Sequence, residues 1–98
     1  MTEELRLAAR IDALPGKGEE LAGLLAALVD DTRGEEGCLR YDLYRDPSNP
    51  DTWIFVENWA SHELWQQHVD GPRFKAFVKE IEGIARGGPY KLDPTRVR

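Results

Sequence analysis

The sequence has 98 residues, of which 41% are hydrophobic and 32% are charged, and its formal net charge is −5 at pH 7. This length and composition predict one folded domain spanning residues 1–98 and exclude an intrinsically disordered chain. The acidic balance argues against nucleic acid and anionic membranes as partners, because both require a basic surface.

Membrane insertion and secretion are also not expected. The longest apolar stretch, residues 21–29, is well short of the roughly 20 residues that cross a bilayer. The N-terminus carries acidic residues where a signal peptide would have basic ones, and Cys38 is the single cysteine, with no partner in the chain for a disulfide. The cytoplasm is therefore the expected location.

The first 34 residues predict a strand followed by a helix. Apolar and polar side chains alternate over residues 5–12, which is the period of a strand with one apolar face. A break rich in glycine and proline follows, and Glu19 and Glu20 place acidic groups where a helix begins. Leucines recur at helical spacing over residues 21–29, and Gly34 is suited to end the helix.

The middle of the chain predicts a hairpin. Residues 38–45 and 53–59 are both rich in strand-forming side chains, and the turn-forming segment 46–51 lies between them. These two strands are expected to pair antiparallel.

The last third predicts an interrupted helix and a short strand. Ser61 is a good N-cap for a helix whose apolar face carries Trp65 and His68. Gly71-Pro72 kinks or splits this helix, and the helical stripe resumes over residues 74–85. The strand that follows is expected over residues 90–92.

The resulting order, β-α-β-β-α-β, predicts an α+β fold of the ferredoxin-like kind, an antiparallel sheet with helices on one face. Large side chains occupy both faces of the strands expected over residues 38–45 and 53–59, and an apolar second face would need to be covered by another subunit. We therefore expect a homodimer.

Several segments together resemble the antibiotic biosynthesis monooxygenase (ABM) superfamily. The segment 36–47 reads EGCLRYDLYRDP and the segment 53–61 reads WIFVENWAS. His68 and the sequence RFKAF at 73–77 complete the pattern, and the similarity extends over about residues 6–90.

The resemblance implies a dimeric α/β barrel and a cofactor-independent monooxygenase that oxidises a quinol or another small electron-rich aromatic with molecular oxygen. An electron-rich phenolate can reduce oxygen directly, so the protein needs to supply a dry pocket and hold the substrate anion. A related branch of the superfamily degrades haem with a histidine ligand, but Val78 stands at that position here. Neither a metal nor any other cofactor is expected.

The candidate catalytic residues are Asn58, His68 and Trp59. The amide of Asn58 can donate a hydrogen bond to a substrate or oxygen-derived atom, and His68 can accept a phenolic proton near neutral pH. The candidate substrate-binding residues share an aromatic side chain that can stack on a planar substrate. They are Tyr41, Tyr44, Trp65 and Phe74.

Structural roles remain open for the same residues. His68 can be a core or interface histidine, Asn58 can end a strand, and the tryptophans can serve packing alone. The strand arginines can bind a substrate anion or pair with Asp12, Asp42 or Glu57. The alternative functions are a non-catalytic dimeric module that binds a small aromatic metabolite and a domain that serves assembly alone.

Overall fold

A computed structural model describes residues 3–92, so residues 1–2 and 93–98 of the expected domain 1–98 lie outside the described residues. Within this range the chain forms four strands and three helices. The elements are β1 (Leu5–Asp12), α1 (Gly18–Thr32), β2 (Cys38–Arg45), β3 (Thr52–Trp59), α2 (His62–Asp70), α3 (Pro72–Glu80) and β4 (Tyr90–Leu92).

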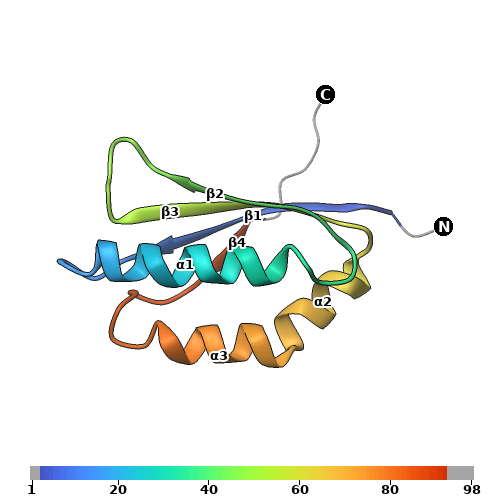
Figure 1. Cartoon of the computed structure of the whole chain (residues 1–98). Coiled ribbons are helices and arrows are strands. Elements are labelled where there is room, and N and C mark those ends of the chain that lie inside the picture. The colour runs from blue at the N-terminus through green and yellow to red at the C-terminus, as the bar shows by residue number, and fades with distance from the viewer. Residues whose placement is uncertain (1–2, 93–98) are drawn as a thin grey trace.

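The strands form one antiparallel sheet in the order β2-β3-β1-β4, and the helices cover one of its faces (Figure 1). This arrangement confirms the α+β, ferredoxin-like fold predicted from the sequence. Among residues 3–92, no helix combines the length and apolar character that crossing a membrane requires.

Strand β3 is central to the sheet, because it is hydrogen-bonded to β1 on one side and to β2 on the other. Its side chains alternate strictly between the two faces, as in any pleated strand. Trp53, Phe55, Glu57 and Trp59 are buried on the face that carries the helices. The intervening residues, such as Asn58, therefore lie on the opposite face, which we call the open face.

The core lies between the sheet and the helices. Helix α1 buries Leu21, Leu25 and Leu28 completely, and Phe77 of α3 is also fully buried. Phe55 and Trp59 of β3 face them from the sheet and are themselves fully buried. Large apolar side chains packed in this way supply most of the stabilisation of a small domain.

The break between α2 and α3 follows the prediction. The hydroxyl of Ser61 accepts a hydrogen bond of 3.2 Å from the backbone N–H of Leu64, which caps the start of α2. Gly71 then has extended backbone angles, φ −77° and ψ 162°, and Pro72 is the first residue of α3. The helix is thus split at Gly71-Pro72.

The prediction that the second part of this helix continues to residue 85 is wrong. Helix α3 ends at Glu80, and Gly83 follows with a φ of 76°, a value that favours glycine and stops the helix. The backbone at residues 84–85 pairs instead with the residues that follow β1. The N–H of Leu14 donates to the carbonyl oxygen of Ile84 at 2.8 Å, and Ala85 forms a bridge with Ala13.

Gly37 brings the loop that follows α1 against α2. Its φ is 84°, and a Cβ added there would lie 2.5 Å from Cδ1 of Leu64. We expect Gly37→Ala to lower the free energy of unfolding by about 1–3 kcal/mol, because it combines backbone strain with overpacking. Urea denaturation monitored by tryptophan fluorescence measures this change.

Gly23→Ala is the matched control, because an added Cβ at Gly23 on the exposed side of α1 meets nothing within 4 Å. This substitution should raise the free energy of unfolding by about 0.5–1 kcal/mol. Equal stability of the two variants would contradict the tight approach assigned to Gly37.

Candidate functional site

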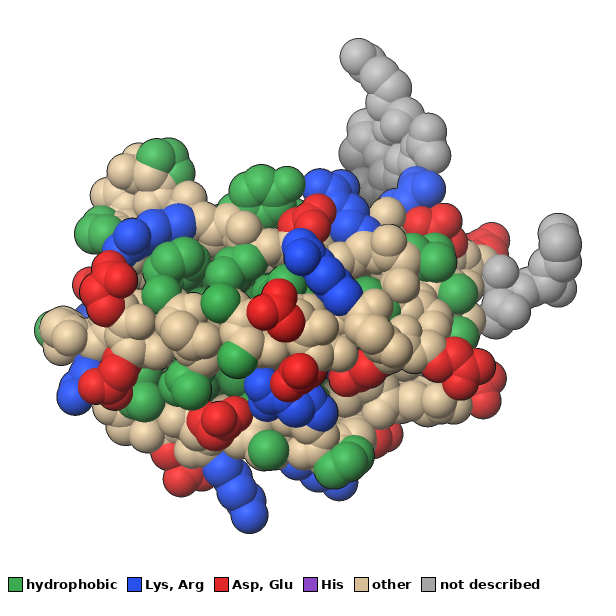
Figure 2. Space-filling view, in the orientation of Figure 1, with side chains coloured by type: hydrophobic (Ala, Val, Ile, Leu, Met, Phe, Trp, Pro, Cys, Tyr) green, Lys and Arg blue, Asp and Glu red, His purple; other side chains and the backbone are tan. Residues whose placement is uncertain are grey.

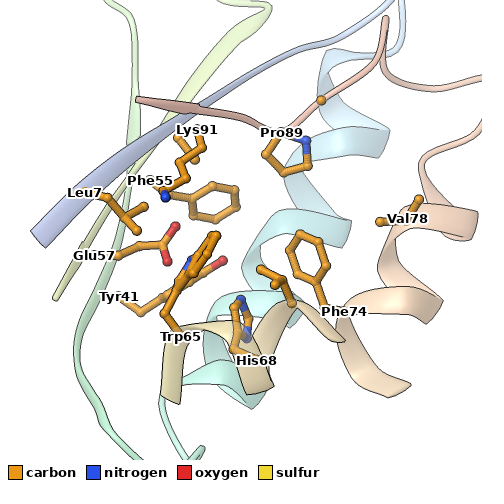
Figure 3. Close-up of a pocket in the computed structure, with 13 residues that line it drawn as sticks. Leu7, Tyr41, Phe55, Glu57, Trp65, His68, Phe74, Val78, Pro89 and Lys91 are labelled. Carbon is orange, nitrogen blue, oxygen red and sulfur yellow. The ribbon is translucent and has the colours of Figure 1, made fainter. Parts of the chain in front are cut away.

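A cavity of about 240 Å³ lies between the sheet and the helices α2 and α3 (Figure 3). Most of its wall is apolar or aromatic, and the segment leading into β4 closes one side. The lining residues are Leu7, Ala9, Tyr41, Phe55, Glu57, Trp65, His68, Val69, Phe74, Val78, Gly88, Pro89 and Lys91.

Glu57 is a buried carboxyl group in this cavity, and its residue is 4% exposed. One carboxyl oxygen accepts a hydrogen bond of 2.9 Å from the indole Nε1–H of Trp59. Burial raises the pKa of Glu57 to about 7, and the Trp59 hydrogen bond and the Lys91 charge act in the opposite direction. Near neutral pH the carboxyl group therefore exists in both its neutral and its ionised form.

His68 projects from α2 into the same region. Its Nδ1 lies 2.7 Å from Oε1 of Glu35, in the loop after α1, and its ring stacks on Trp59 with centroids 4.8 Å apart. Burial lowers the pKa of His68, and the hydrogen bond and charge of Glu35 oppose that shift. A neutral imidazole at pH 7 can accept a proton.

Tyr41 of β2 lies beside His68, with ring centroids 5.6 Å apart. Burial, and then the charge of Glu57, raise the pKa of Tyr41 well above its usual value of 10. Its phenol therefore stays protonated and can act as a hydrogen-bond donor.

Lys91 of β4 and Trp65 of α2 close the cavity on the side opposite the core. The ammonium Nζ of Lys91 lies 4.2 Å from the ring centroid of Trp65, a cation–π distance. Figure 3 shows Lys91 above Glu57, with Trp65 between them and His68. Glu57 and Tyr41 lie toward one side of the cavity, the polar end, and Phe74 and Val78 lie toward the other side, the apolar end (Figure 3). His68 belongs to the polar end and contacts Phe74, with ring centroids 5.0 Å apart.

Four of the residues predicted from the sequence line the cavity: His68, Tyr41, Trp65 and Phe74. Trp59 is fully buried beneath it and contacts two of the polar lining residues, through a hydrogen bond to Glu57 and through its stack on His68.

The structure does not bring Asn58 and Tyr44 to the cavity. Both lie on the open face of the sheet, where Asn58 is a register partner of Arg6 and Arg40. Tyr44 is 49% exposed, and its hydroxyl oxygen accepts a hydrogen bond of 3.2 Å from Nη2 of Arg40. The cause is the two-residue period of a strand, which turns Asn58 away from its neighbours Glu57 and Trp59.

Glu57, Glu35 and Lys91 also belong to this region and were not predicted from the sequence. Glu57 was expected to pair with the strand arginines, but it lies on the helix-covered face, whereas Arg6, Arg10 and Arg40 lie on the open face. On the open face Arg10 pairs with Asp12 at 3.1 Å and Arg40 pairs with Asp42 at 2.6 Å. The available signal was the position of Glu57 two residues from both Phe55 and Trp59.

Among residues 3–92, no group of three or more His, Cys, Asp and Glu side chains is arranged to hold a metal ion. Cys38 is half-buried, and burial followed by the charges of Glu57 and Glu35 raises the pKa of its thiol. A raised pKa keeps this thiol protonated and weakly nucleophilic.

The family model described as antibiotic biosynthesis monooxygenase matches residues 5–80. The chain belongs to this ABM family. The matched residues run from β1 through α3 and include most of the cavity lining. The lining residues Gly88, Pro89 and Lys91 lie beyond the match.

Relatives and solved structures agree with this family. "Putative monooxygenase YcnE" of Bacillus subtilis is 32% identical over 72 residues, which is 74% of this chain and 76% of the relative. "Uncharacterized protein sll1783" of Synechocystis is 30% identical over 87 residues, 88% of this chain, and the chain spans 59% of that relative's length. The crystal structure of PA3566 from Pseudomonas aeruginosa has a TM-score of 0.84 at 31% identity and 98% coverage of both chains.

Replacing Glu57 should change how the stability of this ABM domain depends on pH. The pKa of Glu57 in the folded protein, about 7, lies above its ordinary value of 4.5, so the unfolded chain loses this proton at a lower pH than the folded chain. The free energy of unfolding therefore falls as the pH rises from about 4.5 to 7. The loss approaches about 3 kcal/mol above pH 7. Glu57→Gln should remove this component, as urea denaturation between pH 4.5 and 8 measures.

Glu63→Gln is the matched control, because Glu63 is exposed in the first turn of α2. Its profile should follow that of the native protein. A Glu57→Gln profile that also follows the native one would contradict the raised pKa.

Proposed function

We propose that this ABM protein is a cofactor-independent monooxygenase that oxidises a quinol or another small electron-rich aromatic with molecular oxygen. The family membership and the name of the Bacillus subtilis relative support a monooxygenase-like activity. The observation that carries the proposal is that His68 and the buried carboxyl group of Glu57 line the same aromatic-walled cavity.

The volume of the cavity favours a small substrate. Pockets that hold drug-sized ligands are roughly 300–1,000 Å³, whereas this cavity is about 240 Å³. An aromatic substrate of one or two rings fits it better than a large polycyclic one. The apolar wall at Phe74 and Val78 would face the ring, and the polar end would face its hydroxyl groups.

The proposed reaction begins with proton transfer from a substrate hydroxyl to Nε2 of His68. The resulting phenolate is electron-rich enough to reduce molecular oxygen, and one oxygen atom forms a bond to a ring carbon. The O–O bond then breaks, the second oxygen leaves as water with two substrate protons, and the quinol becomes a hydroxyquinone. Atoms and electrons balance with oxygen as the sole oxidant.

Glu57 and Tyr41 supply hydrogen-bond donors for the anion in this scheme. A neutral carboxyl in an apolar site can donate to a developing oxyanion, and a protonated phenol can do the same. Activity should therefore require neutral His68 and protonated Glu57. The expected rate profile is bell-shaped, rising through the lowered pKa of His68 and falling as pH passes about 7.

The decisive experiment measures oxygen uptake by metal-stripped, flavin-free protein with a panel of hydroquinones, catechols and anthrones. We expect His68→Ala to lower kcat about 100-fold or more, because a general base contributes roughly 10²–10⁴-fold. His62→Ala is the matched control, since His62 is exposed at the start of α2. The absence of uptake across the panel would contradict the proposal.

A non-catalytic module that binds a small aromatic metabolite is the second candidate, and the Trp65–Lys91 contact at the cavity favours it. The fluorescence of Trp65 would report binding in either case. A binding module would show affinity for the panel without oxygen uptake, whereas an enzyme would lose rate far more than affinity in His68→Ala.

We also propose that the protein is a homodimer that pairs through the open face of the sheet. Tyr44, Tyr90 and Leu92 on this face are 49%, 56% and 51% exposed, and Val56 lies among them on the central strand. Figure 2 shows hydrophobic side chains between basic ones along the upper edge of the molecule, where this face is seen from the side. These apolar and aromatic side chains lie beside Arg10, Arg40 and Asp42 on the same face, and exposed apolar side chains grouped with charged ones are typical of an interaction surface.

Light scattering after gel filtration tests the dimer. The native protein should have twice the 11.1 kDa mass of one chain, and Val56→Arg should have the mass of one chain, because it places a charge in the centre of the face. Ala26→Arg on the exposed side of α1 should remain dimeric. A native mass of one chain at micromolar concentration would contradict this proposal.

A further inference from the structure

His68 lies between the cavity and a second depression, a groove on the surface of the molecule. On one side is the cavity described above, and on the other is a surface groove of about 310 Å³ between the loop after α1 and the junction of α2 and α3. His68 lines both. The groove residues are Glu35, Glu36, Leu64, Gln67, His68, Gly71, Pro72 and Arg73.

Glu35 contacts His68 from the groove side. Its Oε1 lies 2.7 Å from Nδ1, and the two side chains are 28% and 1% exposed, respectively. A carboxylate oxygen only accepts hydrogen bonds, so Nδ1 carries the proton in this contact. The neutral ring then has an unprotonated Nε2, and this nitrogen lies on the cavity side (Figure 3).

Backbone hydrogen bonds fix the loop that carries Glu35. The N–H of Glu35 donates to the carbonyl oxygen of Thr32 at 2.9 Å, and the N–H of Cys38 donates to the carbonyl oxygen of Glu35 at 3.2 Å. The carbonyl oxygen of Gly37 accepts from the N–H of Ala60 at 2.8 Å, which ties the loop to the start of α2. The position of Glu35 relative to His68 is therefore set by backbone contacts on both sides.

We propose that Glu35 is a positioning residue that fixes the tautomer and orientation of His68 so that Nε2 accepts the substrate proton inside the cavity. The same carboxylate stabilises the imidazolium ion that this transfer forms, in the way that a third group supports a nucleophile and base pair. The proton on Nε2 later moves to the oxygen that leaves as water, and the proton on Nδ1 stays with the Glu35 contact. The catalytic consequence rests on the proposed function, but the tautomer does not.

Other groups also face His68 and need to be considered for its titration. Tyr41 of β2 approaches the ring edge, and Glu57 of β3 is linked to it through the stacked Trp59. Arg73 of α3 lines the groove, but its guanidinium pairs with Asp31 at 2.6 Å and with Glu80 at 3.2 Å. Burial is the largest influence on the pKa of His68 and lowers it, and Glu35, which makes the direct contact with the imidazole, is the charged group that opposes this shift.

The test is nitrogen NMR of the two histidine rings in the native protein and in Glu35→Gln, with Glu36→Gln as the matched control. Glu36 is an exposed neighbour in the same groove, so the control removes the same charge without removing the contact. We expect native His68 to be protonated at Nδ1. In Glu35→Gln the pKa of His68 should fall further, because the amide lacks the carboxylate charge, whereas Glu36→Gln should leave the pKa unchanged.

Kinetics supply the second measurement. Glu35→Gln should lower kcat on the order of 100-fold with little change in KM. The acidic limb of the pH–rate profile should move to lower pH, because the pKa of His68 falls. Glu35→Asp retains the negative charge, so its His68 pKa and its kcat should both lie between those of the native protein and Glu35→Gln.

The outcomes separate the two proposals. An Nε2-protonated His68 in the native protein, or an unchanged titration in Glu35→Gln, would overturn the role of Glu35. The expected tautomer and titration in a protein that consumes no oxygen would support the positioning role of Glu35 and contradict the proposed function alone.

Discussion

The hydrogen bond from the indole of Trp59 to Glu57 connects the core of this domain to its cavity. Trp59 is fully buried, and its ring also stacks on His68, so one side chain contacts both Glu57 and His68. A buried carboxyl group is costly unless a donor satisfies it. The donor here belongs to the same strand, two residues away, so the twist and position of β3 set the geometry of the site.

Much of the fold was predictable because its signals are local. The alternation in β1, the leucine stripe of α1 and the Ser61 cap each depend on neighbours in sequence, and each appears in the structure. The end of α3 was not predictable in this way. The apolar stripe continues to Ala85, but those residues contact the end of β1, and this long-range pairing replaces the helix.

The site was predictable only in part, because both faces of β3 are apolar. Sequence alone could not show which alternating set faces the helices, and a glutamate among buried aromatic residues argues against the correct choice. Asn58 was therefore selected where Glu57 is the residue in the cavity. The contact of Glu35 with His68 joins residues 33 positions apart, through a loop whose path has no local signal.

The raised pKa of Glu57 has a consequence for ligand binding. Near neutral pH a fraction of the molecules carries the ionised carboxylate, and a ligand that prefers the neutral form has to draw a proton from solvent as it binds. Its apparent affinity would then fall about tenfold for each pH unit above the pKa. The observed binding enthalpy would also vary with the buffer, since the buffer supplies the proton. For such a ligand, binding and proton uptake would be one coupled equilibrium.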